Sequence, residues 1–136
     1  MPASHVVYTW EEFPEYQATQ QLSRCIGRIL VSLPRGTRRA IGRTLIRAPM
    51  LIAQGIAGAS ADMTAGDVMT IDERETFRRG ALAGIHVLRD ALRILKAQRL
   101  GSIPDLLAAL ELVDRIESWV SRRVLPGQLR PLDASE

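Results

Sequence analysis

Apolar residues recur every three or four positions along four stretches of the chain, which is the spacing of one buried helix face. These stretches cover residues 12–32, 37–59, 73–99 and 102–125. No stretch alternates apolar and polar residues as a half-buried strand would. The pattern therefore predicts an all-α protein. The predicted core positions are Phe13, Leu22, Cys25, Ile26, Ile29, Leu33, Ile41, Leu45, Ala48, Ile52, Ile56, Phe77, Ala81, Ile85, Leu88, Leu92, Leu95, Ile103, Leu106, Leu110, Val113, Ile116 and Val120.

Proline, glycine and hydroxyl residues predict where these helices end. Leu33-Pro34 should end the first helix, because the residue before a proline avoids helical geometry. Thr37 is the predicted N-cap of the second helix, and Pro49 should kink it by removing one backbone hydrogen bond. Gly101-Ser102 supplies a C-cap for the third helix and an N-cap for the fourth. Residues 60–72 show no clear period and are predicted to form one long, mobile connection.

The lengths of the connections predict the topology. The turns near residues 34 and 101 are short, so the helices that they join should be antiparallel neighbours. The simplest arrangement is an antiparallel up-down-up-down four-helix bundle over residues 12–125. It would follow an N-terminal arm, residues 1–11, and precede a flexible C-terminal tail, residues 126–136.

Composition fits this bundle and predicts a compartment. Hydrophobic residues make up 46% of the 136 residues and aromatic residues only 4%, so the core should be aliphatic. Cys25 is the only cysteine, which excludes an internal disulfide and favours a buried thiol. The N-terminus lacks the pattern of a signal peptide, and the longest uncharged run, residues 48–61, is too short to span a membrane. We therefore expect a cytoplasmic protein that does not bind membranes.

The sequence offers little catalytic chemistry. His5 and His86 are the only histidines, and no HExxH, CxxC or glycine-rich phosphate loop occurs. Asp62, Asp67 and Asp72 have a spacing that fits no calcium signature. We therefore expect no enzymatic activity, no cofactor and no metal.

A stripe of arginines is the strongest functional signal. Arg35, Arg39, Arg43 and Arg47 recur every four residues and so share one helix face, with Arg38 nearby. The 46 residues between Glu15 and Asp62 contain seven arginines and no acid. Such a face would repel itself unless a polyanion or an acidic partner covers it. Two other interpretations stay open: acids of the third and fourth helices pair with the stripe inside the bundle or an oligomer, or a GC-rich genome explains the preference for arginine.

Two further sets of residues are candidates for contacts. Arg78 and Arg79 on the third helix and Arg122 and Arg123 near the end extend the basic surface, although a solvated face explains them equally well. Gly55, Gly58 and Ala59 give the second helix a small-residue face, which we interpret as an oligomer interface.

The spacing of several motifs resembles a bacterial four-helix-bundle family. This family includes proteins encoded in ribosomal-RNA intervening sequences and the accessory variability determinant of diversity-generating retroelements. Its pattern of LP, ten residues, QLRRA, SI and NIAEG is similar to Leu33-Pro34, Thr44-Leu45-Ile46-Arg47-Ala48, Ile52 and Ile56-Ala57. Its later helices resemble Ala81-Leu82-Ala83-Gly84 and Asp114-Arg115-Ile116-Glu117-Ser118-Trp119-Val120. The chain departs from the family's polar positions at Leu51, Gly55, Gly58 and Val87.

The resemblance implies a function as well as a fold. Family members form ring-shaped homo-oligomers, typically pentamers, and the retroelement branch binds nucleic acid and its reverse transcriptase without doing chemistry. By this resemblance we expect the chain to be an accessory protein of a reverse transcriptase, and to bind the sugar-phosphate backbone of RNA or DNA. The alternative is a structural or regulatory scaffold whose positive face binds an acidic protein.

Overall fold

The computed structural model describes residues 14–65 and 71–122, and the side chains of residues 59–65 and 71–72 lie outside this description. Four helices make up almost all of these ranges, and no strand occurs within them. The helices are α1 (Pro14–Ser32), α2 (Arg35–Ala65), α3 (Ile71–Ala97) and α4 (Ile103–Ser121). The predicted all-α class is therefore confirmed.

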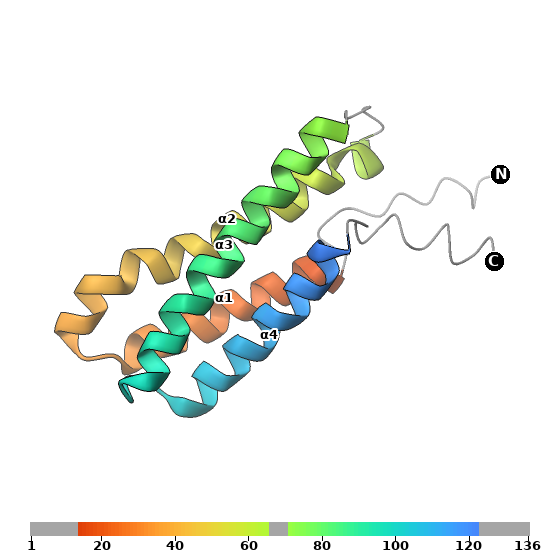
Figure 1. The fold of residues 1–136 in the computed structure, drawn as a ribbon. Helices are drawn as coiled ribbons and strands as arrows, with labels where there is room; N and C mark the ends of the chain where they lie inside the picture. Colours follow the sequence, from red (N-terminus) through yellow and green to blue (C-terminus); the bar gives the residue numbers. More distant parts are fainter. Residues whose placement is uncertain (1–13, 66–70, 123–136) are drawn as a thin grey trace.

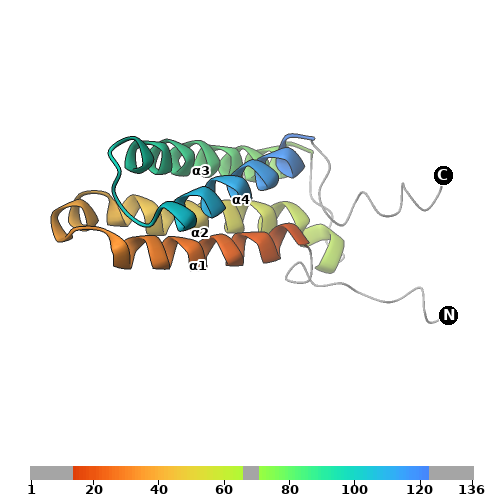
Figure 2. The ribbon, with the colours of Figure 1, turned by 90° about the horizontal axis from the view of Figure 1, so that it is seen from below.

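Each helix packs against the next one in the chain, and α1 also packs against α4. Figure 2 shows α1 and α2 in one layer and α3 and α4 in the other. This is the predicted antiparallel four-helix bundle with up-down-up-down topology. The two middle helices have 31 and 27 residues, whereas α1 and α4 have 19 each. The far ends of α2 and α3 consequently project past α1 and α4 as a two-helix arm (Figure 1).

The bundle interior consists mainly of the aliphatic residues that the sequence predicts. Two predicted core residues are exposed instead: Phe77 keeps 40% of its surface accessible and Ile103 keeps 45%. Arg78 donates to the carbonyl of Val120, near the end of α4, so Phe77 lies where α4 no longer covers α3. Ile103 is the first residue of α4 and lies at the open end of its helix. Ile41 and Leu110 are half-buried, and Phe13 lies outside the described residues.

Helix α2 is longer than predicted at both ends. Its first residue is Arg35, because the amide of Arg38 already donates to the carbonyl of Pro34, so Thr37 lies inside the first turn and is not the N-cap. At the other end, residues 60–65 continue the helix, and α3 begins at Ile71. The prediction of a loop over residues 60–72 is therefore wrong for residues 60–65 and 71–72, which are helical. These residues lack the regular apolar spacing by which we predicted the other helices. Residues 66–70, the predicted arm and the predicted tail lie outside the described residues.

Pro49 lies within α2, and the helix continues on both sides of it. Proline has no backbone N–H, so the carbonyl one turn earlier, that of Leu45, loses its donor. The side chain of Pro49 is buried against the bundle. The kink itself stays a prediction.

Candidate binding surface on helices α1 and α2

Five arginines of α2 stand on the outside of the bundle, and we call them the arginine face: Arg35, Arg38, Arg39, Arg43 and Arg47. All five side chains are exposed. Four of them follow one another at four-residue steps, so a helical rise of about 1.5 Å per residue separates consecutive members by roughly 6 Å along the axis. The face thus presents a row of guanidinium groups about 18 Å long.

No carboxylate among the described side chains lies within ion-pair distance of the arginine face. Within the described part of the chain, one hydrogen bond involves a side chain of the face, and it joins Arg38 Nη2 to the carbonyl of Leu33 at 3.1 Å. That bond satisfies a carbonyl at the end of α1 and leaves the other donors of the guanidinium group to solvent. The arginine face is therefore accessible to an anion of another molecule.

Five acids of α3 and α4 form ion pairs away from the arginine face. Their ion pairs are Asp105 with Arg28, Glu75 with Arg78 and Arg79, Asp114 and Glu117 with Arg89, and Glu111 with Arg115. These pairs lie within α3, within α4 or between α4 and its neighbours. Among the described side chains of one chain, no acid of the later helices therefore pairs with the arginine stripe, and pairing between the copies of an oligomer stays a prediction.

Beside the arginine face, two hollows adjoin between α1 and α2. The larger has a volume of about 420 Å³ and is lined by Leu30 of α1 and by Arg38, Gly42, Arg43, Ile46 and Arg47 of α2. The second, of about 190 Å³, is lined by Ser23, Ile26, Gly27, Leu30, Leu45, Ile46, Pro49 and Met50. Leu30 and Ile46 line both hollows, so together they form one surface depression that we call the α1–α2 groove.

Glycines on both helices help to keep the groove open. A Cβ added at Gly27 would meet nothing within 4 Å. A Cβ added at Gly42 would meet only Leu30 and Arg38, at the ordinary contact distances of 3.8 and 3.9 Å. The space is therefore present because side chains are missing there, and a larger residue at Gly42 would occupy it.

The sequence analysis missed the groove, although a signal for it exists. Gly42, Ile46 and Met50 recur at four-residue steps, as the core stripe does, but they lie beside it. Ile46 and Met50 each leave 53% of their surface exposed. A second apolar stripe on an arginine-rich helix is thus a readable sign of a surface groove.

The other basic residues predicted to bind nucleic acid do not extend this surface. Arg78 pairs with Glu75 and keeps only 12% of its side chain exposed, so it offers little surface to a phosphate, and its role in nucleic-acid binding stays a prediction. Arg79 is 77% exposed and lies 3.6 Å from Glu75, and the exposed Arg122 donates to the hydroxyl of Ser118. Because Phe77 packs on Gly58, the start of α3 lies far along α2 from Arg35. Arg123 lies outside the described residues.

The small-residue face of α2 packs inside the chain. A Cβ at Gly55 would stand 2.6 Å from the carbonyl oxygen of Phe77 and 2.7 Å from the Cβ of Ala81. A Cβ at Gly58 would overlap the ring of Phe77. The prediction that Gly55 and Gly58 form an oligomer interface is therefore wrong, because α3 of the same chain already covers them. The side chain of Ala59 lies outside the described residues.

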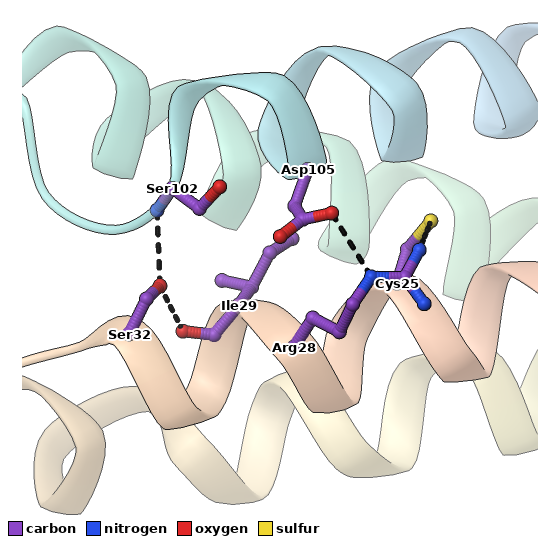
Figure 3. Close-up of polar contacts among 6 residues, drawn as sticks. All are labelled: Cys25, Arg28, Ile29, Ser32, Ser102 and Asp105. Atoms are coloured by element: carbon purple, nitrogen blue, oxygen red, sulfur yellow. Dashed lines mark hydrogen bonds and ion pairs between the residues drawn. The ribbon is translucent and has the colours of Figure 1, made fainter.

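An ion pair and a serine bridge join α1 to α4 (Figure 3). Arg28 Nε lies 3.0 Å from Asp105 Oδ1, and Arg28 Nη2 donates to the sulfur of the buried Cys25 at 3.2 Å. The hydrogen bond from Arg28 lowers the pKa of the Asp105 carboxyl below its ordinary value. Arg28 thereby differs from the arginine face, because its guanidinium group already forms an ion pair within the bundle.

Ser32 is the centre of the serine bridge at the end of α1. Its hydroxyl donates to the carbonyl of Ile29 at 2.7 Å and accepts from the backbone N–H of Ser102 at 2.9 Å (Figure 3). Ser102 is the N-cap residue of α4, as predicted, but its own side chain makes no capping bond. The preceding turn contains Arg99 and Gly101 in the left-handed region, at φ 57° and 86°. Glycine adopts this region without strain, which explains its place before α4.

Arg89 is the one buried member of the basic set among the described residues. It reaches from α3 to α4, where Nη2 lies 3.0 Å from Asp114 Oδ1 and also donates to Glu117. The hydrogen bond from Arg89 is the main reason why the pKa of Glu117 lies below its ordinary value. Sequence reasoning did not identify this pair, because the acids lie 25 and 28 positions away in the chain.

The described residues contain no cluster of three or more histidine, cysteine or acidic side chains that could hold a metal ion. His86 is exposed on α3. None of the described helices is both long and apolar enough to cross a membrane.

Comparison of the chain with protein-family models, with curated proteins and with solved structures finds no match. The family resemblance therefore stays a prediction from the motifs.

Proposed function

We propose that this chain is a non-catalytic bundle that binds the backbone of RNA or DNA through the arginine face. The observation that carries the proposal is the row of exposed guanidinium groups on α2 without a carboxylate partner in the described chain. Guanidinium groups bind phosphate with two parallel hydrogen bonds, and a phosphate backbone supplies the missing negative charge.

The spacing of the face suits a phosphate backbone. Consecutive members of the row stand roughly 6 Å apart along the helix axis. One strand of a B-form duplex presents a phosphate about every 3.4 Å along its axis, so every second phosphate falls near that spacing. A duplex groove or an extended strand could therefore meet several arginines of one subunit.

Recognition through the backbone is the mode that these residues favour. The described aromatic side chains are Tyr16, Phe77 and Trp119, and none of them belongs to the arginine face. Without an aromatic platform, stacking of bases contributes little. If one subunit neutralises about four phosphates, the logarithm of the affinity falls against the logarithm of the salt concentration with a slope of roughly −3 to −4.

A charge-reversal pair of variants tests the proposal. One variant changes Arg35, Arg39 and Arg43 to Glu. The other makes the same change at three exposed cations in the last part of α3 and the turn after it: Arg93, Lys96 and Arg99. Both variants undergo the same change in net charge. Binding of a labelled RNA oligonucleotide at low salt should fall by at least about tenfold in the first variant and much less in the control. Equal losses would show that only net charge matters, and equal affinities would refute the proposal.

By the family resemblance, we further propose that the chain is an accessory subunit of a diversity-generating retroelement reverse transcriptase and acts as a ring-shaped homo-oligomer, a pentamer by that resemblance. Co-purification with a reverse transcriptase encoded beside it, and a solution mass five times that of the chain, are the measurements that test this part.

The second candidate function is a scaffold that binds an acidic protein. The α1–α2 groove favours it, because nucleic acid has no need of an apolar surface beside the arginines. Capture of binding partners by the purified protein, with and without nuclease treatment, distinguishes the two functions. Partners lost on nuclease treatment support nucleic-acid binding, and partners that survive it support the scaffold.

A further inference from the structure

The floor of the α1–α2 groove is apolar and no described helix covers it. Leu30, Ile46 and Met50 are among its apolar lining residues, and the last two are half exposed. Exposed aliphatic side chains grouped in a depression are typical of surfaces that bind a partner. Isolated exposed residues, such as Val31, need no such explanation.

The groove is at least as long as two turns of a helix. Its lining runs from Ser23 to Leu30 on α1 and from Arg38 to Met50 on α2. At about 1.5 Å per residue, these segments are about 10 and 18 Å long. A docked helix with anchors at positions i, i+4 and i+7 spans about 10 Å. The small residues at positions 23, 27 and 42 let its backbone approach closely.

The α2 side of the groove is positive, because Arg38, Arg43 and Arg47 line it there. On α1, the exposed Arg24 follows the lining residue Ser23 in the chain but does not line the groove itself. A ligand that fills the groove must therefore bring apolar side chains for the floor and negative charge for the α2 side.

We propose that the α1–α2 groove binds an acidic amphipathic helix of a partner protein, with its apolar ridge over Leu30 and Ile46 and its carboxylates against Arg43 and Arg47. This proposal deepens the second candidate function, the binding of an acidic protein, and rests on it; it does not depend on nucleic-acid binding. The mode is the packing of a helix into a groove, in which apolar anchors give affinity and flanking charges fix orientation.

A nucleobase fits the groove less well than an apolar side chain. The lining residues contribute one hydroxyl, that of Ser23, and no carboxylate or amide side chain. The donors on the edge of a base would lose water without gaining an acceptor, which is unfavourable. Leucine or isoleucine side chains have no such requirement. The apolar floor thus favours a protein ligand, while the arginines alone would accept either.

A synthetic peptide probes the groove directly. The probe is a helical peptide with leucines at three- and four-residue spacing on one face and glutamates on both flanks, and its control has the same composition in scrambled order. Gly42→Leu fills the larger hollow and removes no charge, and Ile46→Gln removes part of the floor at a half-exposed position. Gly36→Leu is the matched control, because a Cβ at Gly36 meets nothing within 4 Å and Gly36 does not line the groove.

The wild type should bind the amphipathic peptide at least about tenfold more tightly than the scrambled peptide. Gly42→Leu and Ile46→Gln should each weaken the amphipathic peptide by about tenfold or more, while Gly36→Leu binds it as the wild type does. Circular dichroism establishes that each variant is folded. Equal binding of the two peptides, or unchanged binding in both groove variants, overturns the proposal. Loss of RNA binding alone in the groove variants also overturns it and assigns the groove to nucleic acid.

Discussion

Arg28 Nε lies 3.0 Å from Asp105 Oδ1, which joins the C-terminal part of α1 to the first turn of α4. The two residues are separated by 77 positions in the chain. Asp105 is also placed where a carboxylate interacts favourably with the positive end of the α4 dipole. The packing of α1 against α4 therefore depends partly on the ionised state of the Asp105 carboxyl.

This ion pair predicts a pH dependence of stability. The pKa of Asp105 is lower in the folded than in the unfolded chain, so its stabilisation is present above the unfolded pKa, about 3.9, and is lost as pH falls through the folded pKa. Asp105→Asn should destabilise the protein at pH 7, and the difference from wild type should shrink as the pH falls through that range. Urea unfolding at several pH values measures this. Glu111→Gln, at an exposed pair within α4, is the control and should change stability little at pH 7.

The buried Arg89 predicts a larger effect on stability. Its guanidinium group holds Asp114 and Glu117 of α4 and is itself only 11% exposed. Arg89→Ala should lower the free energy of unfolding by about 1–3 kcal/mol, below the range for fully buried pairs, because both acids are partly solvated. The pKa of Glu117 should rise toward its ordinary value in this variant, as NMR titration can measure. An unchanged Glu117 pKa would contradict the assigned pairing.

The close contact of α2 with α3 predicts opposite effects for two glycine substitutions. Gly55→Ala would place a Cβ within 3 Å of Phe77 and Ala81, so it should destabilise the protein by about 1–3 kcal/mol. Gly80→Ala, on the exposed side of α3, meets nothing within 4 Å and should stabilise by about 0.5–1 kcal/mol through helix propensity. Thermal unfolding of both variants distinguishes the two. Destabilisation by both changes to a similar degree would mean that the α2–α3 contact is not as close as described.

The fold was predictable because each helix carries its own periodic signal. Leu22, Leu45, Leu88 and Val113, one on each helix, occupy core positions that the three- and four-residue spacing predicts. The extension of α2 beyond Ala59 was not predictable, because residues 60–65 lack the regular apolar spacing by which the other helices were predicted.

The binding surface was only partly predictable. Four-residue spacing places the arginines on one face, and the structure adds that no described acid reaches them. The lack of acid partners for the arginines reflects ion pairs that acids form with other, distant segments, such as Glu117 with Arg89. A pattern within one helix does not reveal such pairs. The groove depends on how α1 and α2 pack, so Leu30 and Ile46 could not be joined by a pattern within one helix. For the same reason, Gly55 was predicted to be a surface residue although α3 covers it.

The arginine face predicts how the affinity for nucleic acid depends on salt. Arg43 is exposed and has no acid partner among the described residues, so in the proposed complex it neutralises about one phosphate. Arg43→Ala should therefore reduce the magnitude of the slope of log affinity against log salt by about 0.7–0.9. Arg78→Ala removes the same charge from a residue that already pairs with Glu75, so it should leave the slope unchanged. Binding isotherms of an RNA oligonucleotide over a series of salt concentrations measure both slopes. If the two variants shift the slope equally, the phosphate contacts are spread over the whole surface, and the arginine face has no special part in binding.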